Sequence, residues 1–324
     1  MQSDLYVGID VGSVTTKFAA LDNGDELVTS IYLRNEGQPI ISIQRGLKEL
    51  SSKMPADTRI AGVATTGSAR YLAGVLVHAD LVKNEISCQA AAAIHSVPDV
   101  ATVIEIGGQD SKIIIIRNGV VSDMAMNTVC AAGTGSFLDQ QAQRMNMPID
   151  DFGREALKSS KPAYIGGRCA VFAETDMIHK QQVGYKRIDI LRGLCQALAR
   201  NYLSNIATGK EILPPVVFQG GVASNLGMVQ AIEEALGLTV IVPPYPGVTG
   251  AIGAALIVHK ELKSKDNVSS FDGFDIADAD LRASSFECRE CDASCEISQV
   301  FRDDKVLARW GGECSLWEEE VKPE

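Results

Sequence analysis

Two cysteines of the chain stand at positions where a thiol could bind a metal. Cys130 lies in the segment NTVCAAGTGSFLD and Cys169 in IGGRCAVFAETDMIH, and each comes just before a helical pattern. A thiolate at a helix start lies among unpaired backbone N–H groups and at the positive end of the helix dipole, which favours the deprotonated, metal-binding form. Two thiolates are too few for a four-iron cluster, but a two-fold dimer would supply four. The alternative is that both thiols are core residues, because free cysteine is among the most buried residue types.

The segment GIDVGSVTTK carries residue types that bind phosphate and Mg²⁺. Gly12 lets the backbone approach a phosphate closely, and the N–H groups of the turn form the cradle. Asp10 could hold Mg²⁺ through water. Hydroxyl groups that could donate to the same phosphate belong to Ser13, Thr15 and Thr16.

Two later glycine turns repeat this chemistry. In VIEIGGQDSK, Glu105 ends a strand much as Asp10 does, and the residues that follow include Gly107, Gly108, Gln109 and Asp110. In FQGGVASN, Gly220 and Gly221 follow a strand and precede a helix, so this turn could hold the nucleoside or the α-phosphate. One such turn is a weak signal, but three in this order indicate a nucleotide site. No G-x-G-x-x-G joins the first strand to a helix and no P-loop pattern is present, which excludes those two folds.

The apolar patterns predict a mixed α/β protein that is built twice. Strands are expected at Leu5–Ile9, Val14–Leu21, Leu27–Leu33 and Ile60–Ala64, and again at Val103–Ile106, Ser111–Arg117, Val120–Met126, Val216–Gln219 and Thr239–Val242. Helices are expected at Pro39–Leu50, Gly133–Met145, Cys169–Gln182, Ile188–Thr208, Asn225–Leu236 and Thr249–Glu261. Both halves begin with an apolar strand, a glycine turn that holds an acid and a hydroxyl, and a second apolar strand. This internal duplication predicts domains at residues 1–98 and 99–265, followed by an extension at 266–324.

Composition and charge exclude several classes of protein. The 324 residues are 46% hydrophobic, which is enough for the cores of about two domains. The net charge is −11 and no run of Lys and Arg exceeds two residues, so neither nucleic acid nor a membrane surface is an expected partner. Without a signal-peptide pattern or an apolar run of membrane-spanning length, we expect a cytoplasmic protein with reduced or metal-bound cysteines.

The order of these motifs resembles a known family. DVGSVTTK, EIGGQDSK and GGVASN are similar to the two phosphate segments and the adenosine segment of the actin, sugar-kinase and chaperone ATPase superfamily. Within it, the two cysteine segments resemble the cluster-binding segments of the ATPase activators of 2-hydroxyacyl-CoA dehydratases, relatives of the benzoyl-CoA reductase ATPase subunits (BadF/BadG/BcrA/BcrD type). The resemblance implies a duplicated actin-like, or ribonuclease H-like, fold of two domains around a nucleotide cleft.

The resemblance also implies an activity. In that family a homodimer holds one [4Fe–4S] cluster between its subunits, and ATP hydrolysis drives an electron from a ferredoxin or flavodoxin to an iron–sulfur reductase or dehydratase. Carried over by position, Cys130 and Cys169 are the cluster ligands, and Glu105 is catalytic together with Asp10 and Gln109. Residues implied to face the Mg²⁺ and ATP or ADP are Asp10, Gly12, Ser13, Thr15, Thr16, Lys17, Gly107, Gly108, Gln109, Asp110, Gly220, Gly221 and Asn225. Glu105 departs from the superfamily, which usually has Asp there, so its longer side chain would move the water-positioning carboxylate.

The end of the chain carries a separate cysteine pattern. Its members, spaced C-x₂-C-x₃-C-x₁₈-C, are Cys288, Cys291, Cys295 and Cys314. This spacing suits a tetrahedral thiolate site for Zn²⁺, or for iron–sulfur, in a small appended module. The alternative is four reduced cysteines in a loosely packed tail.

The remaining cysteines and histidines have simpler interpretations. Cys88 and Cys195 lie in apolar helical runs and are expected in the core. The histidines show no ligand spacing and are expected at the surface or at helix ends; they are His78, His95, His179 and His259.

Three functions fit these patterns. The first is an ATP-dependent reductive activator. The second is a small-molecule kinase on the same fold, although no segment resembles a sugar-binding one and the two helix-start cysteines would be unexplained. The third is a non-catalytic nucleotide-binding regulator. For an activator, a 2-hydroxyacyl-CoA dehydratase, a benzoyl-CoA-type reductase and another iron–sulfur protein all fit as the electron acceptor.

Overall fold

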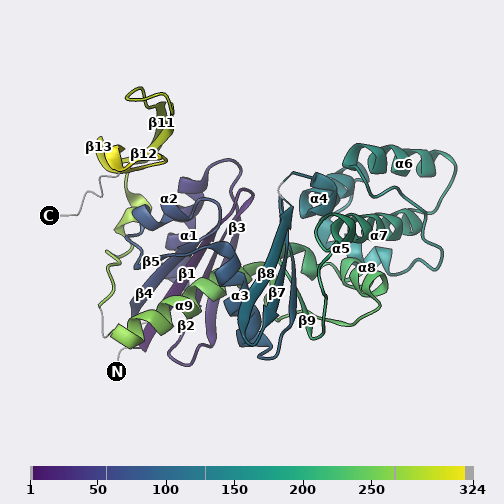
Figure 1. Ribbon diagram of the computed structural model, residues 1–324, viewed down its shortest axis with the longest axis horizontal. Coiled ribbons are helices and arrows are strands. Elements are labelled where there is room, and N and C mark those ends of the chain that lie inside the picture. Colours follow the sequence, from purple (N-terminus) through teal and green to yellow (C-terminus); the bar gives the residue numbers. More distant parts are fainter. Residues whose placement is uncertain (1–2, 56, 128, 266–267, 318–324) are drawn as a thin grey trace. The chain divides into compact units, whose positions relative to one another are not determined.

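The computed structural model describes residues 3–55, 57–127, 129–265 and 268–317, which form two compact units (Figure 1). One unit comprises Met1–Lys83 with Ala254–Glu324, and the other comprises Asn84–Gly253. Both divisions fall earlier than the boundaries after residues 98 and 265 that the sequence suggests. The reason is that helix α3 (Glu85–Ser96) packs on the sheet of the second unit, and most of the closing helix α9 (Thr249–Lys265) packs on the sheet of the first. In the part of the chain described, no helix is long and apolar enough to cross a membrane.

The first unit is built on a five-stranded sheet with the strand order β3-β2-β1-β4-β5. Its strands are β1 (Ser3–Val11), β2 (Thr15–Leu21), β3 (Leu27–Arg34), β4 (Thr58–Thr66) and β5 (Leu81–Val82). Strand β1 pairs antiparallel with β2 and parallel with β4, so it lies at the centre of the sheet.

Helices cover both faces of this sheet. They are α1 (Pro39–Lys53), α2 (Arg70–Leu76) and α9. Leu47 of α1 and Leu76 of α2 join Ile9 and Phe18 of the strands in one apolar cluster. Because successive side chains of a strand point to opposite faces, burial of both faces explains the nearly continuous apolar runs in the sequence.

Helix α9 packs on the face opposite α1 and α2. There the ring of His259 stacks on Tyr6 with ring centroids 4.0 Å apart, and its Nδ1 lies 2.7 Å from Asp25 Oδ1. Gly62 allows this approach, because a Cβ there would lie 2.7 Å from the side chain of Leu262. His259 is therefore buried, and the expectation of a surface or helix-end position is wrong for it, because its ring fills space between helix and sheet.

The second unit repeats the same strand order, as β10-β9-β6-β7-β8. Its strands are β6 (Thr102–Ile106), β7 (Ser111–Arg117), β8 (Val120–Asn127), β9 (Val216–Gln219) and β10 (Val240–Ile241). Its further helices are η1 (Ala131–Gly133), α4 (Gly135–Arg144), α5 (Ile149–Ala156), α6 (Ala170–Gln182), α7 (Arg187–Asn205), η2 (Gly221–Ser224), α8 (Leu226–Leu236) and η3 (Pro246–Val248). Ile104 and Ile113 join the cluster formed with α4 to α8, while Val103 and Ile114 pack with α3. The predicted duplicated α/β fold is thus confirmed.

The two cysteines expected in the core are fully buried. Cys88 lies in α3 and Cys195 in α7. Burial raises the pKa of the Cys195 thiol to about 12, so this thiol stays protonated at neutral pH.

The end of the chain forms a small antiparallel sheet that belongs to the first unit. Its elements are η4 (Asp275–Asp278), β11 (Leu281–Glu287), β12 (Glu296–Arg302), β13 (Lys305–Trp310) and η5 (Ser315–Trp317). Ile276, Ala277 and Val300 join the apolar cluster of the first sheet, and Gln44 Nε2 donates to the carbonyl of Ala279 at 2.9 Å. The extension is therefore packed against the first unit.

Candidate functional site

Asp10 is the last residue but one of β1 and faces Lys17 across the β1–β2 hairpin. The two are ladder partners, and Lys17 Nζ donates to Asp10 Oδ2 at 3.0 Å. Asp10 is 3% exposed, and no group among the described residues donates to its other oxygen, Oδ1, which is also buried. A buried carboxylate oxygen is costly without a partner. This oxygen could accept a hydrogen bond from a water molecule bound to Mg²⁺, as the sequence suggests.

Other residues of this hairpin hold the turn together. Gly12 N donates to Thr15 O at 3.0 Å. The Thr16 hydroxyl donates to Asn35 Oδ1 at 2.6 Å, and Asn35 Nδ2 donates to Gly12 O at 2.6 Å. The Thr16 hydroxyl is thus engaged within the turn, whereas Ser13 at its tip is exposed. Asn35 is missed by sequence reasoning, because it reaches the turn from the end of β3.

The second unit repeats this arrangement at Glu105. Glu105 and Lys112 are ladder partners, and Lys112 Nζ lies 3.1 Å from Glu105 Oε2. Gly107 N donates to Asp110 O at 3.0 Å, as Gly12 does to Thr15 in the first unit. The turn residue Gln109 is exposed, so its amide is accessible to a ligand.

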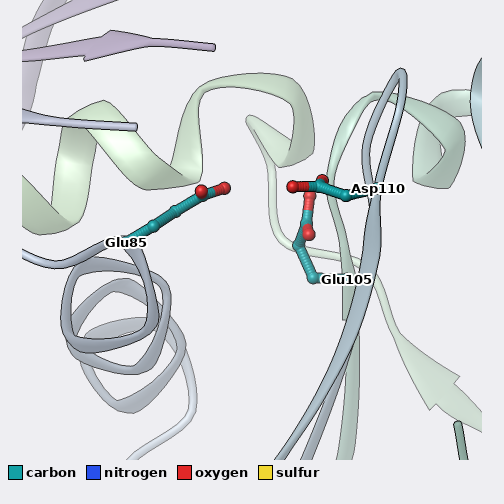
Figure 2. A group of neighbouring side chains, drawn as sticks. All are labelled: Glu85, Glu105 and Asp110. Atoms are coloured by element: carbon teal, nitrogen blue, oxygen red, sulfur yellow. The ribbon is translucent and has the colours of Figure 1, made fainter. Parts of the chain in front are cut away.

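Three carboxylates surround the ammonium of Lys112, which is almost fully buried. Besides Glu105, they belong to Asp110, whose Oδ1 lies 2.8 Å away, and to Glu85, whose Oε1 lies 3.0 Å away. Glu85 is the first residue of α3 and points toward the other two acids (Figure 2). Their oxygens lie within 4.8 Å of one another, the spacing of metal ligands, but Lys112 already supplies a cation there. No sequence motif connects Glu85 to this turn, which is why it is missed.

The pKa of Glu105 is shifted toward neutrality. Burial raises it to about 7; the Lys112 ammonium opposes this rise, and the charges of Glu85 and Asp110 add to it. Burial disfavours the Lys112 ammonium too, yet the three carboxylates raise the pKa of Lys112 well above its usual value. A carboxyl group that exchanges a proton near pH 7 suits a residue that orients or deprotonates water.

A glycine approaches each of these carboxylates from the neighbouring parallel strand. Gly67 follows β4 with φ +90°, and Gly220 follows β9 with φ +89°. A Cβ would lie 2.6 Å from Asp10 Oδ1 at Gly67, and 2.7 Å from Glu105 Oε1 at Gly220. Gly67 lies in the segment TTGSAR, whose single glycine gives little signal, although the duplication makes it the counterpart of Gly220.

In the third glycine turn, the residues that follow Gly220 form the short helix η2 and the N-cap of α8. Gly221 is exposed at the start of η2. Asn225 Oδ1 accepts a hydrogen bond from Met228 N at 3.1 Å, so this side chain caps α8.

The Gly107–Gly108 turn is hydrogen-bonded to the helix that follows Cys130. Gly135 N donates to Gly107 O at 2.8 Å, and Ser136 donates to Gly108 O through its N at 2.8 Å and its Oγ at 2.6 Å. A Cβ on Gly135 would lie 2.9 Å from Gly107 O, so glycine permits this approach. The first two residues of α4 therefore connect the turn to the segment of Cys130.

Cys130 and Cys169 both lie at the start of a helix, as predicted. Cys130 is the N-cap of the short helix η1, and Cys169 is the N-cap of α6. Both thiols are partly exposed, and η1 contacts α6. Large apolar side chains within five residues of them in the sequence are exposed to solvent: Val129 at 93%, Phe172 at 70%, and also Tyr164 and Val171. Such apolar exposure is typical of a protein–protein interface.

The four cysteines of the extension lie at one end of its small sheet. Cys288 N donates to Cys295 O at 2.8 Å, and Trp317 Nε1 donates to Cys288 Sγ at 3.2 Å. Cys291 and Cys314 are exposed. Over the ranges that the structure describes, no three sulfur atoms lie within 4.8 Å of one another, so the tetrahedral site stays a prediction.

Comparison with known proteins assigns the chain to a family. The BadF/BadG/BcrA/BcrD ATPase family matches residues 7–258. The (R)-2-hydroxyglutaryl-CoA dehydratase activating ATPase of Acidaminococcus fermentans is 37% identical over 258 residues, which are 79% of this chain and 97% of that relative. The 2-hydroxyisocaproyl-CoA dehydratase activator of Clostridioides difficile is 34% identical over 259 residues, or 79% and 96% of the two chains.

A solved structure supports the same conclusion. The activator of the 2-hydroxyisocaproyl-CoA dehydratase from Clostridium difficile, with bound ADPNP, aligns with a TM-score of 0.75 and 33% identity over 82% of this chain and 100% of that one. The family match covers most of the chain, and it includes both hairpins and both helix-start cysteines. The chain therefore belongs to the BadF/BadG/BcrA/BcrD ATPase family.

Proposed function

We propose that the protein is an ATP-dependent reductive activator. Its homodimer would hold one [4Fe–4S] cluster through Cys130 and Cys169 of each subunit and deliver single electrons to a partner iron–sulfur reductase or dehydratase. The electron donor would be a ferredoxin or flavodoxin. Membership of an ATPase family and the names of the relatives as dehydratase activators support this proposal. The observation that carries it is the hydrogen bond from the Ser136 hydroxyl to the Gly108 carbonyl, because it connects the predicted phosphate-binding turn to the segment of Cys130.

Each hairpin carries residues that would bind the nucleotide. Asp10 holds Mg²⁺ through water, and Lys17, which is partly exposed, offers its ammonium to the phosphate groups. When bound, Mg²⁺ neutralises charge that develops on the transferred phosphoryl group. Glu105 orients the attacking water, and the exposed Gln109 contacts the γ-phosphate or that water.

The cysteines would bind the cluster at a subunit interface. Cys130 and Cys169 supply two thiolates, and a two-fold partner supplies the other two. Val129 and Phe172, exposed beside them, are the apolar side chains that such an interface would cover. When bound, an iron–sulfur cluster supplies one-electron chemistry whose potential responds to hydrogen bonds and to solvent at the sulfurs.

The Gly108–Ser136 contact gives the nucleotide a route to Cys130. A change at the Gly107–Gly108 turn, when the γ-phosphate is bound or lost, would shift the first turn of α4. Since η1 and Cys130 directly precede α4, the surroundings of the Cys130 sulfur would change with the nucleotide state. ATP hydrolysis would thereby control when the electron leaves.

The test is ATP-dependent reduction of a low-potential one-electron dye by anaerobically purified protein. We expect a brown protein that reduces the dye only with ATP, and we expect Ser136→Ala to lower the number of electrons delivered per ATP hydrolysed. Ser52→Ala is the matched control, because Ser52 is exposed in the last turn of α1 and its hydroxyl donates to the carbonyl of Glu49. A colourless protein, or dye reduction that ignores ATP, would contradict the proposal; sugar phosphorylation by a colourless protein would favour a kinase.

We also propose a thiolate metal site in the extension, formed by Cys288, Cys291, Cys295 and Cys314. The backbone bond between Cys288 and Cys295 supports it, as does the Trp317 N–H that contacts the Cys288 sulfur. Metal analysis should find one zinc per chain, or additional iron, that Cys291→Ser removes. A chain with no metal beyond the dimer cluster would contradict this site.

A further inference from the structure

One side chain contacts both segments that carry the proposed cluster ligands. Asn201 lies in α7 and is 2% exposed. Its Nδ2 lies 2.5 Å from the carbonyl oxygen of Gly167, two residues before Cys169, and 3.6 Å from the Sγ of Cys130. Its Oδ1 lies 3.7 Å from the same sulfur, where it accepts from Cys130 while that residue is a protonated thiol. A single buried amide therefore lies between two segments that are far apart in the sequence.

The hydrogen bonds of Asn201 fix the orientation of its amide. The Gly167 carbonyl can only accept, so the atom facing it must be the NH₂ group. The Oδ1 atom accepts from Asn205 Nδ2 at 3.0 Å, as this orientation requires. One N–H of Asn201 is thus used by Gly167, and its second N–H is left for the Cys130 sulfur. When Cys130 is a thiolate it has no proton to give, so this N–H···S contact is the attractive one.

Glycines let both segments approach α7. A Cβ on Gly133, three residues after Cys130, would lie 2.7 Å from Asn201 Oδ1. A Cβ on Gly167 would lie 2.6 Å from the carbonyl oxygen of Ala197, one turn before Asn201 in α7. Both ligand segments are therefore shaped to reach this part of the helix.

Asn127 holds the Cys130 segment from the other side. Its Oδ1 accepts from Cys130 N at 2.8 Å, and its Nδ2 donates to Cys130 O at 2.8 Å. These two bonds fix the backbone of Cys130, whereas Asn201 alone of the two asparagines contacts the sulfur.

We propose that Asn201 is a positioning residue of the cluster site, which ties the Cys130 and Cys169 segments together and donates an N–H to the Cys130 sulfur. The inference rests on the proposed function, in which these two cysteines bind the cluster. A one-electron reduction adds one negative charge to the cluster and its thiolates, and a nearby N–H donor stabilises that charge. Asn201 therefore raises the reduction potential and slows the loss of iron.

The experiment compares full-length dimers of the wild type, Asn201→Leu and Asn201→Asp. Leucine has nearly the shape of asparagine without its polar atoms, and aspartate keeps the acceptor for Asn205 but loses the N–H donors. Asn205→Leu is the control on the same helix, because it removes a bond to Oδ1 and leaves both contacts of Nδ2. The measured quantities are the midpoint potential, from a redox titration followed by electron paramagnetic resonance, and the rate of iron release to a chelator.

Both Asn201 variants should have a more negative midpoint potential than the wild type. Iron release should be faster on the order of tenfold, the lower range for losing a residue that supports a metal ligand. Asn205→Leu should match the wild type in both measurements. If Asn201→Leu does not fold, Asn201→Ala gives the answer, because it removes the N–H donors without adding the charge by which aspartate itself lowers the potential.

The outcomes separate the two proposals. A wild-type potential in the Asn201 variants would overturn the sulfur contact and leave the proposed function intact, even if iron is lost faster. A wild type that binds no cluster through Cys130 and Cys169 would overturn both.

Discussion

The ammonium of Lys112 lies 3.1 Å from the carboxylate of Glu105, its partner across the β6–β7 ladder. Lys17 and Asp10 have the same relationship in the first unit, at 3.0 Å. The two pairs differ in their neighbours, because Glu105 shares its lysine with two further carboxylates whereas Asp10 has an oxygen left for a ligand. The duplicated hairpin thus provides a candidate metal-holding acid in one unit and an acid that titrates near neutrality in the other.

ATPase activity should depend on the ionisation of Glu105. Because burial raises the pKa of this carboxyl to about 7, the ionised form accumulates only as the pH rises through that value. ATPase turnover should therefore rise between about pH 6 and 8. Glu105→Gln should remove this rise and lower turnover on the order of a hundredfold. A turnover that is flat over this range in the wild type would exclude Glu105 as the titrating group.

Replacing Lys112 should destabilise the protein, and more so at high pH. Lys112→Met leaves three carboxylates close together without their cation, which costs about 3–5 kcal/mol for a buried pair that loses one partner. The cost should shrink at about pH 5, because a carboxyl whose folded pKa is raised takes up a proton and loses its unfavourable charge. Urea unfolding at two pH values measures this, with Lys17→Met, whose ammonium pairs with Asp10 in the other hairpin, for comparison. An equal cost at both pH values would mean that the carboxylates do not interact as described.

Asp10→Asn and Gln109→Ala should lower ATPase turnover and leave the fold intact. Asp10→Asn removes the charge that would hold Mg²⁺, and Gln109→Ala removes an exposed amide from the turn of the second hairpin. The loss expected for each is on the order of tenfold to a thousandfold. Asp4→Asn is a suitable control, because its carboxylate pairs with Arg59 on the surface. Turnover close to that of the wild type in both site variants would refute the assignment of this site.

Gly67→Ala should cost much more stability than Gly37→Ala. Both glycines have positive φ, which costs an alanine about 1 kcal/mol. At Gly37 nothing lies within 4 Å of the added Cβ, whereas at Gly67 the Cβ would lie 2.5 Å from the carbonyl oxygen of Val11. Overpacking of this kind adds about 1–3 kcal/mol. Thermal unfolding of both variants measures the difference; similar melting temperatures would argue against the close approach at Gly67.

Elements that depend on residues close together in the chain could be predicted from the sequence. The hairpin at Asn118-Gly119, the strands beside Asp10 and Glu105, and the helix starts after Cys130 and Cys169 all follow from local turn and cap chemistry. These elements also carry most of the predicted nucleotide-binding and cluster-binding residues.

Contacts between distant segments were not predictable in this way. Glu85 reaches Lys112 from a preceding helix, and Asn201 reaches Cys130 from a later one, so neither is part of a motif. The first strand of the extension, β11, was missed because its side chains are mostly polar and show little alternation. His259 was placed at the surface because its packing on Tyr6 depends on α9 returning to the first sheet.

The most direct test of the central claim is the iron content of the anaerobically reconstituted dimer. To avoid iron bound by the extension, the full-length chain should carry Ser at positions 288, 291, 295 and 314. The account predicts about four irons per dimer, or about two per chain, since four thiolates hold one such cluster. It also predicts loss of the iron in Cys130→Ala and in Cys169→Ala, and its retention in the core variants Cys88→Ala and Cys195→Ala. Four irons per monomer, or a full cluster in either Cys130→Ala or Cys169→Ala, would contradict it.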